Sequence, residues 1–326
     1  MHSRLLLSTL SLAALSLNAQ DAAPKPKPIT YTDPATAKGG FRSQGEYVGK
    51  LNGENFAIQV VALGKREYDA VLCPGGLPGA GWTQKPNPRQ VVHGEVHTDS
   101  VDFQGDAGHG VLRETLVWTD ASGASTHLKR IERTSPTLGA KPPAGGVVLF
   151  DGKDTDSFQS GAKMTDDGLL MQGCTSKESF GDCTLHVEFR LPYMPEARGQ
   201  GRGNSGLYLA SRYEVQMLDS FGLKGENNEC GGFYTIAKPL VNMCLPPLTW
   251  QTYDIEFTAA KFDASGTKTA DAKATVRHNG VLIHDNVALP KTTTSAPIST
   301  EGPTGPIHLQ NHNNEVRYRN IWLVKK

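Results

Sequence analysis

The sequence predicts an all-β protein in which a small β domain precedes a larger β-sandwich of the jelly-roll type. Glycine and proline are abundant, with 35 and 20 among 326 residues, whereas only 20% of the residues are charged. This composition is unfavourable for a helical bundle or a coiled coil and is typical of many short strands joined by turns. Short runs of alternating apolar and polar residues recur along the chain and support this fold class.

The N-terminus is predicted to direct export. Residues 1–19 contain an early arginine, an apolar run and a small residue at position 19, which is the pattern of a cleavable signal peptide. The apolar run is shorter than the roughly 18 residues that a membrane span needs. We therefore expect a periplasmic or secreted protein. Residues 20–40 begin with a stretch rich in proline and lysine and are predicted to form a disordered linker.

A joint rich in proline and glycine separates two β units. Residues 41–134 contain short runs such as FAIQVVAL and YDAVLC, which predict a small all-β domain of unknown role. Residues 135–146 form the joint. Residues 147–326 continue with the strictly alternating segment TLHVEFRLP and with HNG, a tight hairpin turn of the Asn-Gly kind. This pattern predicts the sandwich.

The charge balance excludes several kinds of partner. The chain has 33 basic and 33 acidic residues, so its formal net charge is zero. A protein that binds nucleic acid or a membrane surface would need a basic surface. We therefore expect no nucleic-acid partner and no membrane insertion, and the balance suits a neutral ligand such as a sugar.

The five cysteines can become oxidised in an exported protein. Cys230 and Cys244 flank a short segment, and Cys174 and Cys183 bracket an expected turn. These two pairs are the preferred disulfides and leave Cys73 free, although the sequence alone does not fix the pairing. The absence of a Cys-x-x-Cys pair disfavours a zinc site.

The segment YEVQMLDS carries three polar side chains that are candidates for chemistry. Glu214 and Gln216 share a face of the expected strand, whereas Asp219 faces the other way unless a bulge brings it back. Laminarinase-type glucanases use a similar acidic strand, but here Gln216 replaces the middle acid. Two suitably spaced carboxyls can hydrolyse a glycosidic bond. The alternative is that the three are only polar groups on a sheet face.

The segment GPIHLQNH places His308, Gln310 and His312 on one strand face. Such groups can bind sugar hydroxyls, hold a metal or supply a base near neutral pH. Asn204 lies in a glycine-rich strand entry, where binding residues are common. Several aromatic residues are candidates for stacking on sugar rings, although each is individually more typical of a core: Tyr208, Tyr213, Tyr234, Trp250 and Tyr253.

The segment from Val147 to Val324 resembles the 3-keto-disaccharide hydrolase domain family, also described as 3-keto-glucoside lyase and 3-keto-2-hydroxy-glucal hydratase domains. The resemblance rests on stretches that occur in family order: LFDGKD, ESFGDCTLHVEFR, GNSGLYL, YEVQMLDS, WQTYDIEF, HNGVLIHDNV, GPIHLQNH and RYRNIWL. It implies a concanavalin A-like jelly roll. Family motif positions fall on Glu188, Asn204, Glu214, Gln216, Asp219, His308, Gln310 and His312. Where members often have Asp-His-Gly, this chain has Asn311-His312-Asn313.

The resemblance also implies a reaction. A ketone at carbon 3 of a sugar acidifies the proton at carbon 2, a base removes this proton, and the aglycone leaves from carbon 1. Water adds to the resulting 2-hydroxy-glucal, which gives net hydrolysis. Such a site needs a base, an acid, and donors or a divalent metal for the enolate oxygen. No other cofactor is expected.

The expected roles follow from this reaction. His308 or His312 is expected to be the base, and Glu214 or Asp219 the acid or a metal ligand. Six residues are expected to bind the substrate: Glu188, Asn204, Gln216, Gln310, Trp250 and Tyr253. Two alternatives are a non-catalytic carbohydrate-binding module and an ordinary glycoside hydrolase acting through Glu214 and Asp219.

Overall fold

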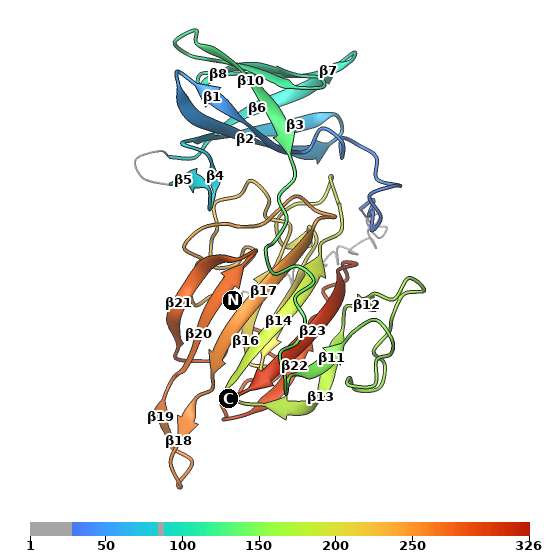
Figure 1. The fold of residues 1–326 in the computed structure, drawn as a ribbon, viewed down its shortest axis with the longest axis vertical. Coiled ribbons are helices and arrows are strands. Elements are labelled where there is room, and N and C mark those ends of the chain that lie inside the picture. The colour runs from blue at the N-terminus through green and yellow to red at the C-terminus, as the bar shows by residue number, and fades with distance from the viewer. Residues whose placement is uncertain (1–27, 84–87) are drawn as a thin grey trace, which may run out of the picture.

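The computed structural model describes residues 28–83 and 88–326 and is built almost entirely of β-strands (Figure 1). The predicted signal peptide at residues 1–19 lies outside the described residues. In the described part of the chain, no helix is long and apolar enough to cross a membrane. A barrel stands above a two-layered sandwich in Figure 1, and the predicted all-β fold class is confirmed.

The first unit is a closed barrel in which every neighbouring pair of strands is antiparallel. Around the barrel the order is β1-β10-β9-β8-β7-β6-β3-β2. The bounds are β1 Gly45–Leu51, β2 Glu54–Gly64, β3 Glu67–Pro74, β6 Gln90–His97, β7 Ser100–Gly105, β8 Gly108–Leu112, β9 Leu116–Asp120 and β10 Ser125–Ile131. Tyr47, Phe103 and Trp118 are fully buried and fill the interior. The strands thus close on each other and leave no open edge.

The second unit is a sandwich of two antiparallel sheets. One sheet, here called the back sheet, has the order β11-β23-β14-β17-β20-β21, with β12 also paired to β23. Its bounds are β11 Val147–Phe150, β12 Leu170–Met171, β14 Cys183–Arg190, β17 Trp250–Thr258, β20 Ala272–His278, β21 Val281–Leu289 and β23 Arg317–Lys325. The other, here called the site sheet, has the order β13-β22-β15-β16. Its bounds are β13 Cys174–Phe180, β15 Ser205–Leu209, β16 Tyr213–Met217 and β22 Gly305–Leu309.

The core of the sandwich lies between these sheets and follows the alternation of the sequence. Val187 and Phe189 of β14 and Leu207 of β15 are completely buried in one hydrophobic cluster. Asn279 and Gly280 join β20 to β21 with φ values of 50° and 78°, as the predicted tight hairpin requires. Short pieces complete the structure: β4 Leu77–Pro78, β5 Gly81–Trp82, β18 Lys261–Phe262, β19 Lys268–Ala270 and the 3-10 turn η1 Gly199–Gly201.

The barrel packs directly on the loops at one end of the sandwich. Strand β2 is buried on both faces: Ile58 points into the barrel, whereas Val61 belongs to the sandwich core. A Cβ atom on Gly222 would lie 2.5 Å from Val61 Cγ2, so only glycine fits at this contact. The two units therefore share hydrophobic surface, which explains why FAIQVVAL is apolar at every position except Gln59.

The predicted disorder of residues 20–40 does not hold for the part that the structure describes. Tyr31 and Tyr193 exchange two backbone hydrogen bonds of 3.0 and 2.9 Å, and their rings stack with centroids 6.0 Å apart. The Tyr193 hydroxyl also donates to Gly39 O at 2.7 Å. These contacts fix a segment whose composition alone is typical of a flexible linker.

Neither predicted disulfide is present, because all five cysteines are free and buried. Cys174 begins β13 and Cys183 begins β14, in different sheets. Strand β13 runs from Cys174, opposite Leu309, to Phe180, opposite Gly305. These four steps of β22 place Cys174 roughly 13 Å, at 3.3 Å per residue, from the end of β13 at which the chain turns toward Cys183, so this expectation is wrong. Cys230 and Cys244 are neighbours whose side chains interact, and their oxidation in an exported protein stays a prediction.

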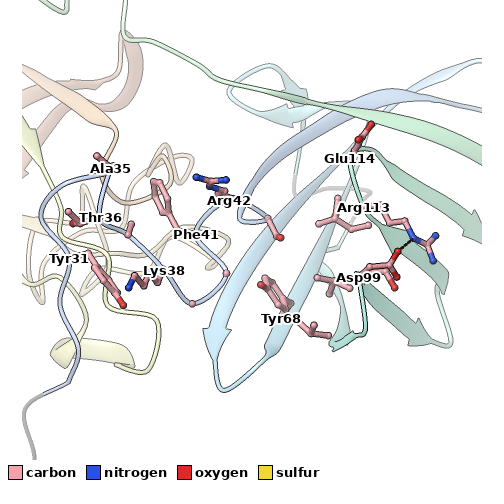
Figure 2. Close-up of a pocket in the computed structure, with 18 residues that line it drawn as sticks. Tyr31, Ala35, Thr36, Lys38, Phe41, Arg42, Tyr68, Asp99, Arg113 and Glu114 are labelled. Atoms are coloured by element: carbon pink, nitrogen blue, oxygen red, sulfur yellow. Dashed lines mark ion pairs between the residues drawn. The ribbon is translucent and has the colours of Figure 1, made fainter.

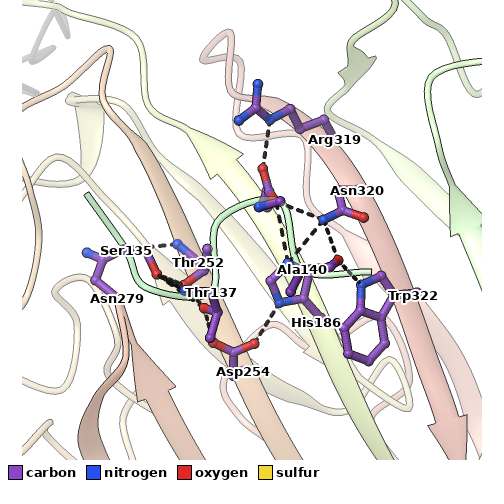
Figure 3. A network of polar contacts seen from close by, with 12 residues as sticks. Ser135, Thr137, Ala140, His186, Thr252, Asp254, Asn279, Arg319, Asn320 and Trp322 are labelled. Carbon is purple, nitrogen blue, oxygen red and sulfur yellow. Dashed lines mark hydrogen bonds and ion pairs between the residues drawn. The ribbon is translucent and has the colours of Figure 1, made fainter. Parts of the chain in front are cut away.

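A buried polar network fastens the joint between the units to the outer face of the back sheet (Figure 3). His186 Nδ1 lies 2.6 Å from Asp254 Oδ1, and His186 Nε2 lies 3.6 Å from Glu188 Oε1. The joint contributes Thr137, which donates to Asp254 at 2.6 Å, and the Gly139 N–H, which donates to Glu188 at 2.5 Å. The network thus holds the strap of chain that links barrel and sandwich.

Two pKa values in this network are shifted by its hydrogen bonds. Burial opposes a charge on His186, but the hydrogen bonds to Asp254 and Glu188 outweigh burial and raise the pKa of His186. Burial also opposes a charge on Glu188, yet hydrogen bonds from His186, Asn320 and Arg319 lower its pKa to about 2. The network is therefore most stable with both groups charged.

We expect His186→Gln to weaken the fold and to change its pH dependence. Protonated His186 contributes stability that is fully present below the unfolded pKa of 6.5 and is lost as the pH rises through the higher folded value. Urea unfolding between about pH 5 and pH 9 should show this loss in the wild type and not in the variant. The variant should be less stable by about 3 kcal/mol at the acidic end, since it leaves buried carboxylates without their partner.

The exposed pair of His93 and Asp69, 3.4 Å apart, supplies the control. Because an exposed ion pair contributes little, His93→Gln should lower the free energy of unfolding by less than about 1 kcal/mol. Equal slopes for the wild type and His186→Gln would contradict the assignment.

Candidate active site

The outer face of the site sheet carries the polar residues that the alternation of the sequence placed there. In the register, Tyr208 pairs with Glu214 on one side and with His308 on the other, and Gly206 pairs with Gln216. The intervening residues Leu207 and Val215 point into the core. Sequence alternation therefore correctly predicts which side chains share this face.

A cavity of about 140 Å³ opens on this face. It is lined by Gln200, Asn204, Tyr208, Glu214, Gln216, Tyr234, Thr294, Ser295, Gln310 and His312. Its volume equals that of about five waters at roughly 30 Å³ each, which is the scale of a single sugar ring. Amides, hydroxyls and one imidazole surround one carboxyl, a lining that suits a neutral polar ligand.

Glu214 is the buried acid of this cavity and is only 3% exposed. Its carboxyl lies against the backbone of Gly206, where a Cβ atom would come within 2.1 Å of Glu214 Oε1. Burial raises the pKa of Glu214 to about 7, against a smaller opposing effect of the Tyr208 hydroxyl bond. The carboxyl can therefore gain and lose a proton near neutral pH.

The amide groups of the cavity leave two acceptors without partners. Asn204 Oδ1 and Gln310 Oε1 are buried and form no hydrogen bond. Gln310 Nε2 donates to the Tyr208 hydroxyl at 3.2 Å, and Asn204 Nδ2 donates to Gln200 O at 2.7 Å. Because a buried unpaired acceptor costs free energy, these two oxygens mark where ligand hydroxyl groups would donate.

Gln216 completes this wall. In the orientation that satisfies its neighbours, its amide nitrogen donates to Glu214 Oε1 at 3.0 Å and to Ser205 O at 2.9 Å. The amide is thereby fixed beside the acid. Its backbone carbonyl accepts a 2.7 Å hydrogen bond from the Tyr253 hydroxyl beneath the sheet.

The two histidines lie in different environments. His312 is exposed and lines the rim of the cavity. His308 shares the sheet face, but its Nδ1 is 2.8 Å from the Thr175 hydroxyl and it does not line the cavity. Burial lowers the pKa of His308, so its imidazole is neutral at neutral pH.

Besides His308, four predicted site residues lie outside the cavity. Asp219 follows β16 and is held by Arg202, with Nε 2.6 Å from Oδ2, so no bulge returns it to the site face. Glu188 is in the network of Figure 3 on the back sheet. Trp250 is also on the back sheet, with the Arg319 guanidinium 4.1 Å above its ring. Tyr253 is completely buried in the core. Alternation alone does not tell an outward face of one sheet from that of the other.

Sequence reasoning missed three cavity residues, namely Gln200, Thr294 and Ser295. They lie on loops without strand alternation. Near Gln200, the glycine-rich segment before Asn204 is the one sequence feature that indicates a binding loop. Ser295 adopts a positive φ of 62°, which no sequence pattern indicates. Tyr208 and Tyr234, considered as stacking residues, do line the cavity.

Within residues 28–83 and 88–326, no group of three His, Cys, Asp or Glu side chains is placed to hold a metal ion. At the cavity, the residues beside Glu214 and His312 carry only amide and hydroxyl groups. These donors do not form a preorganised set for a divalent cation. We therefore derive no catalytic step through a metal.

A larger groove of about 1160 Å³ lies elsewhere, between residues 31–43 and one end of the barrel (Figure 2). Tyr31 and Phe41 face Asp99 and Arg113 across it, and the latter two form an exposed ion pair of 3.5 Å. None of the predicted site residues lines this groove. The chemistry-bearing residues thus gather at the smaller cavity.

Comparison with known proteins identifies the domain that carries this cavity. Residues 145–324 match the model of the 3-keto-alpha-glucoside-1,2-lyase-like domain. The chain belongs to this family. No curated protein matches the chain. The match spans the whole sandwich, so the cavity and its acid lie within the family domain.

Two solved structures are similar to part of this chain. A candidate glycosyl hydrolase from Parabacteroides distasonis ATCC 8503 is 31% identical, with a TM-score of 0.52 over 56% of this chain and 85% of that chain. A second candidate glycosyl hydrolase from the same organism is 15% identical, with a TM-score of 0.42 over 56% of this chain and 94% of that chain. The family and the first structure support a carbohydrate-active enzyme.

We expect Glu214→Gln to stabilise the protein at alkaline pH. The folded state favours the neutral carboxyl, so this contribution to stability is present below the ordinary pKa of 4.5 and is lost as the pH rises through the folded pKa of about 7. A neutral amide avoids the loss, which amounts to about 3 kcal/mol at 1.36 kcal/mol per pKa unit. Urea unfolding at about pH 8 should show the variant to be more stable than the wild type. A less stable variant would contradict the conclusion that burial raises the pKa of Glu214.

Proposed function

We propose that the protein cleaves 3-keto-glycosides by elimination followed by hydration. The observation that carries the proposal is the buried Glu214 carboxyl with a pKa of about 7, beside two unpaired acceptors in a cavity of sugar-ring size. Family membership supports the same chemistry. The signal-like N-terminus supports action in the periplasm or outside the cell.

The proton-transfer roles are best divided between the buried acid and the rim histidine. Ionised Glu214 removes the proton from carbon 2 of the keto-sugar, and the C–H electrons form the enolate of the carbon 3 ketone. The enolate then restores the ketone, forms the double bond between carbons 1 and 2, and expels the aglycone oxygen. His312 at the rim, where the aglycone has room to leave, supplies the proton to that oxygen.

Hydration completes net hydrolysis. His312, which lost its proton in the first half, takes one proton from a water molecule whose oxygen bonds to carbon 1, and the electrons of the C1=C2 double bond move into the enolate of the ketone. Glu214, protonated in the first half, then returns its proton to carbon 2, so both groups regain their starting states. Asn204 Oδ1 and Gln310 Oε1 accept sugar hydroxyl groups. The Gln216 amide, whose two N–H groups bond to Glu214 and Ser205, holds the base in place, and the Tyr234 hydroxyl on the cavity wall donates to the enolate oxygen. His308 supports Tyr208 from the neighbouring strand, since the two rings lie 5.6 Å apart. This division exchanges the roles expected for Glu214 and the histidines.

The structure weakens the case for an ordinary two-carboxylate hydrolase. Asp219 is engaged by Arg202, and Glu214 is the one carboxylate among the described residues that line the cavity. A retaining or inverting pair needs a second carboxyl within about 10 Å across the sugar. We therefore favour the elimination, which needs a single base.

The decisive experiment incubates the purified protein with 3-keto-glucosides, with and without chelator, and detects aglycone and glucal by mass spectrometry. Glu214→Gln should lower turnover about 10²–10⁴-fold, the usual contribution of a general base. Glu256→Gln is the matched control, since Glu256 is 64% exposed and pairs only with Lys326 at 3.0 Å. Absence of product from every keto-sugar would contradict the proposal and favour a binding module, whereas cleavage of unoxidised β-glucans would favour the ordinary hydrolase.

The pH profile distinguishes a base from an acid. If Glu214 acts as the base, the rising limb of the kcat/KM profile should follow an apparent pKa near 7, whereas the proton required on His312 produces the falling limb of a bell-shaped profile. Tyr208→Phe removes a hydrogen bond that lowers this pKa, so the rise should move to higher pH. A profile that instead falls through this region, or one that Tyr208→Phe leaves in place, would refute the assignment.

A further inference from the structure

We propose that the barrel is a positioning element for the cavity: the end of strand β2 holds the turn η1 that places Gln200. The inference rests on the site of the proposed function but not on its reaction. It gives a role to the N-terminal domain, whose residues do not line the cavity.

Gln200 connects three walls of the cavity. Its backbone carbonyl accepts the 2.7 Å hydrogen bond from Asn204 Nδ2, and its side-chain Nε2 donates to Asn228 O at 2.8 Å. Its amide also lies 2.9 Å from the amide of Gln216. Any shift of η1 would therefore move the residues that flank Glu214.

Two arginines at the ends of η1 fasten it to the barrel. Arg198 Nη2 donates to Leu63 O, and Arg202 Nη2 donates to Ala62 O at 3.2 Å. Arg202 also holds Asp219 through Nε and is only 5% exposed. Consecutive carbonyls at the end of β2 thus receive guanidinium donors from both sides of the turn.

The carbonyls of Ala62 and Leu63 are available for different reasons. Ala62 lies beyond the last partner of β2 in β1, since Gly45 pairs with Val60, and a β-bulge frees Leu63. The register between β2 and β3 shifts between Ala62 and Gly64, which leaves Leu63 outside the regular ladder. Gly64 has a φ of 76°, and a Cβ there would lie 2.6 Å from Glu196 Cγ. The sequence therefore keeps glycine where the hairpin end of the barrel approaches the segment that leads into η1.

The barrel also touches the opposite wall. Arg89 Nε donates to Gly222 O at 2.7 Å, and Gly222 packs on Val61. Gly222 lies in the loop that continues to Asn228, the partner of Gln200. Both segments that meet at Gln200 are thus in contact with strand β2 of the barrel.

Hydrogen–deuterium exchange of the full chain tests the proposal without reference to activity. The amides of Gly201 and Arg202, bonded to Arg198 O and Gly199 O, and the Asn204 amide, bonded to Asn314 Oδ1, report on η1. In Arg198→Ala, their exchange should become about tenfold faster, because a hydrogen bond to a charged group is lost. Arg202→Lys keeps a positive charge near Asp219 but loses the forked donors and should act in the same direction.

Arg66→Ala is the matched control. Arg66 also donates to a backbone carbonyl, Val96 O at 2.9 Å, but within the barrel, so exchange at η1 should stay unchanged. Turnover of the keto-sugar gives a second readout, in which Arg198→Ala should raise KM more than it lowers kcat.

Unchanged exchange at η1 in a folded Arg198→Ala protein would overturn the proposal. Since Arg198 is exposed, this variant carries the test even where Arg202→Lys fails to fold. A wild type that turns over no keto-sugar would defeat the proposed function, whereas the exchange result would still decide the role of the barrel.

Discussion

The buried ion pair of Arg202 and Asp219 is the interaction on which both the cavity and the contact between the two units depend. Desolvating two charges is expensive, and the pair is favourable only where its geometry is good and its remaining donors are satisfied. Here the 2.6 Å contact meets the first condition, and the carbonyls of Ala62 and Pro195 meet the second. One guanidinium therefore joins the exit of β16, the turn before β15 and the barrel.

The cost of burying a charge also determines the properties of the cavity. Glu214 has no such cation, and Gly206 allows its carboxyl to lie against the backbone. The fold thus pairs one acid, Asp219, with a guanidinium and leaves a second acid, Glu214, with a pKa near neutral pH. Environment, and not residue type, separates a structural carboxylate from a reactive one.

The sequence predicted the sheet faces well because side chains alternate strictly along a strand. Glu214, Gln216 and Gln310 lie together as expected, and so do the strands that present them. It failed where long-range packing decides the outcome. Glu188 also points outward from an alternating strand, but the joint covers it with the Gly139 amide. No local pattern indicates which of two outward faces another segment will cover.

The contact between the barrel and the sandwich is a second feature that local sequence patterns do not predict. Alternating runs predict strands, but a continuously apolar run such as that around Val61 fits either a central strand or a strand buried on both faces. The structure selects the second, since one face fills the barrel and the other packs on the sandwich. Because both faces of β2 are buried, the carbonyls of Ala62 and Leu63 at its end have fixed positions, and Arg202 and Arg198 bond to them. Strand β2 therefore determines both the contact between the two units and the position of η1 beside the cavity.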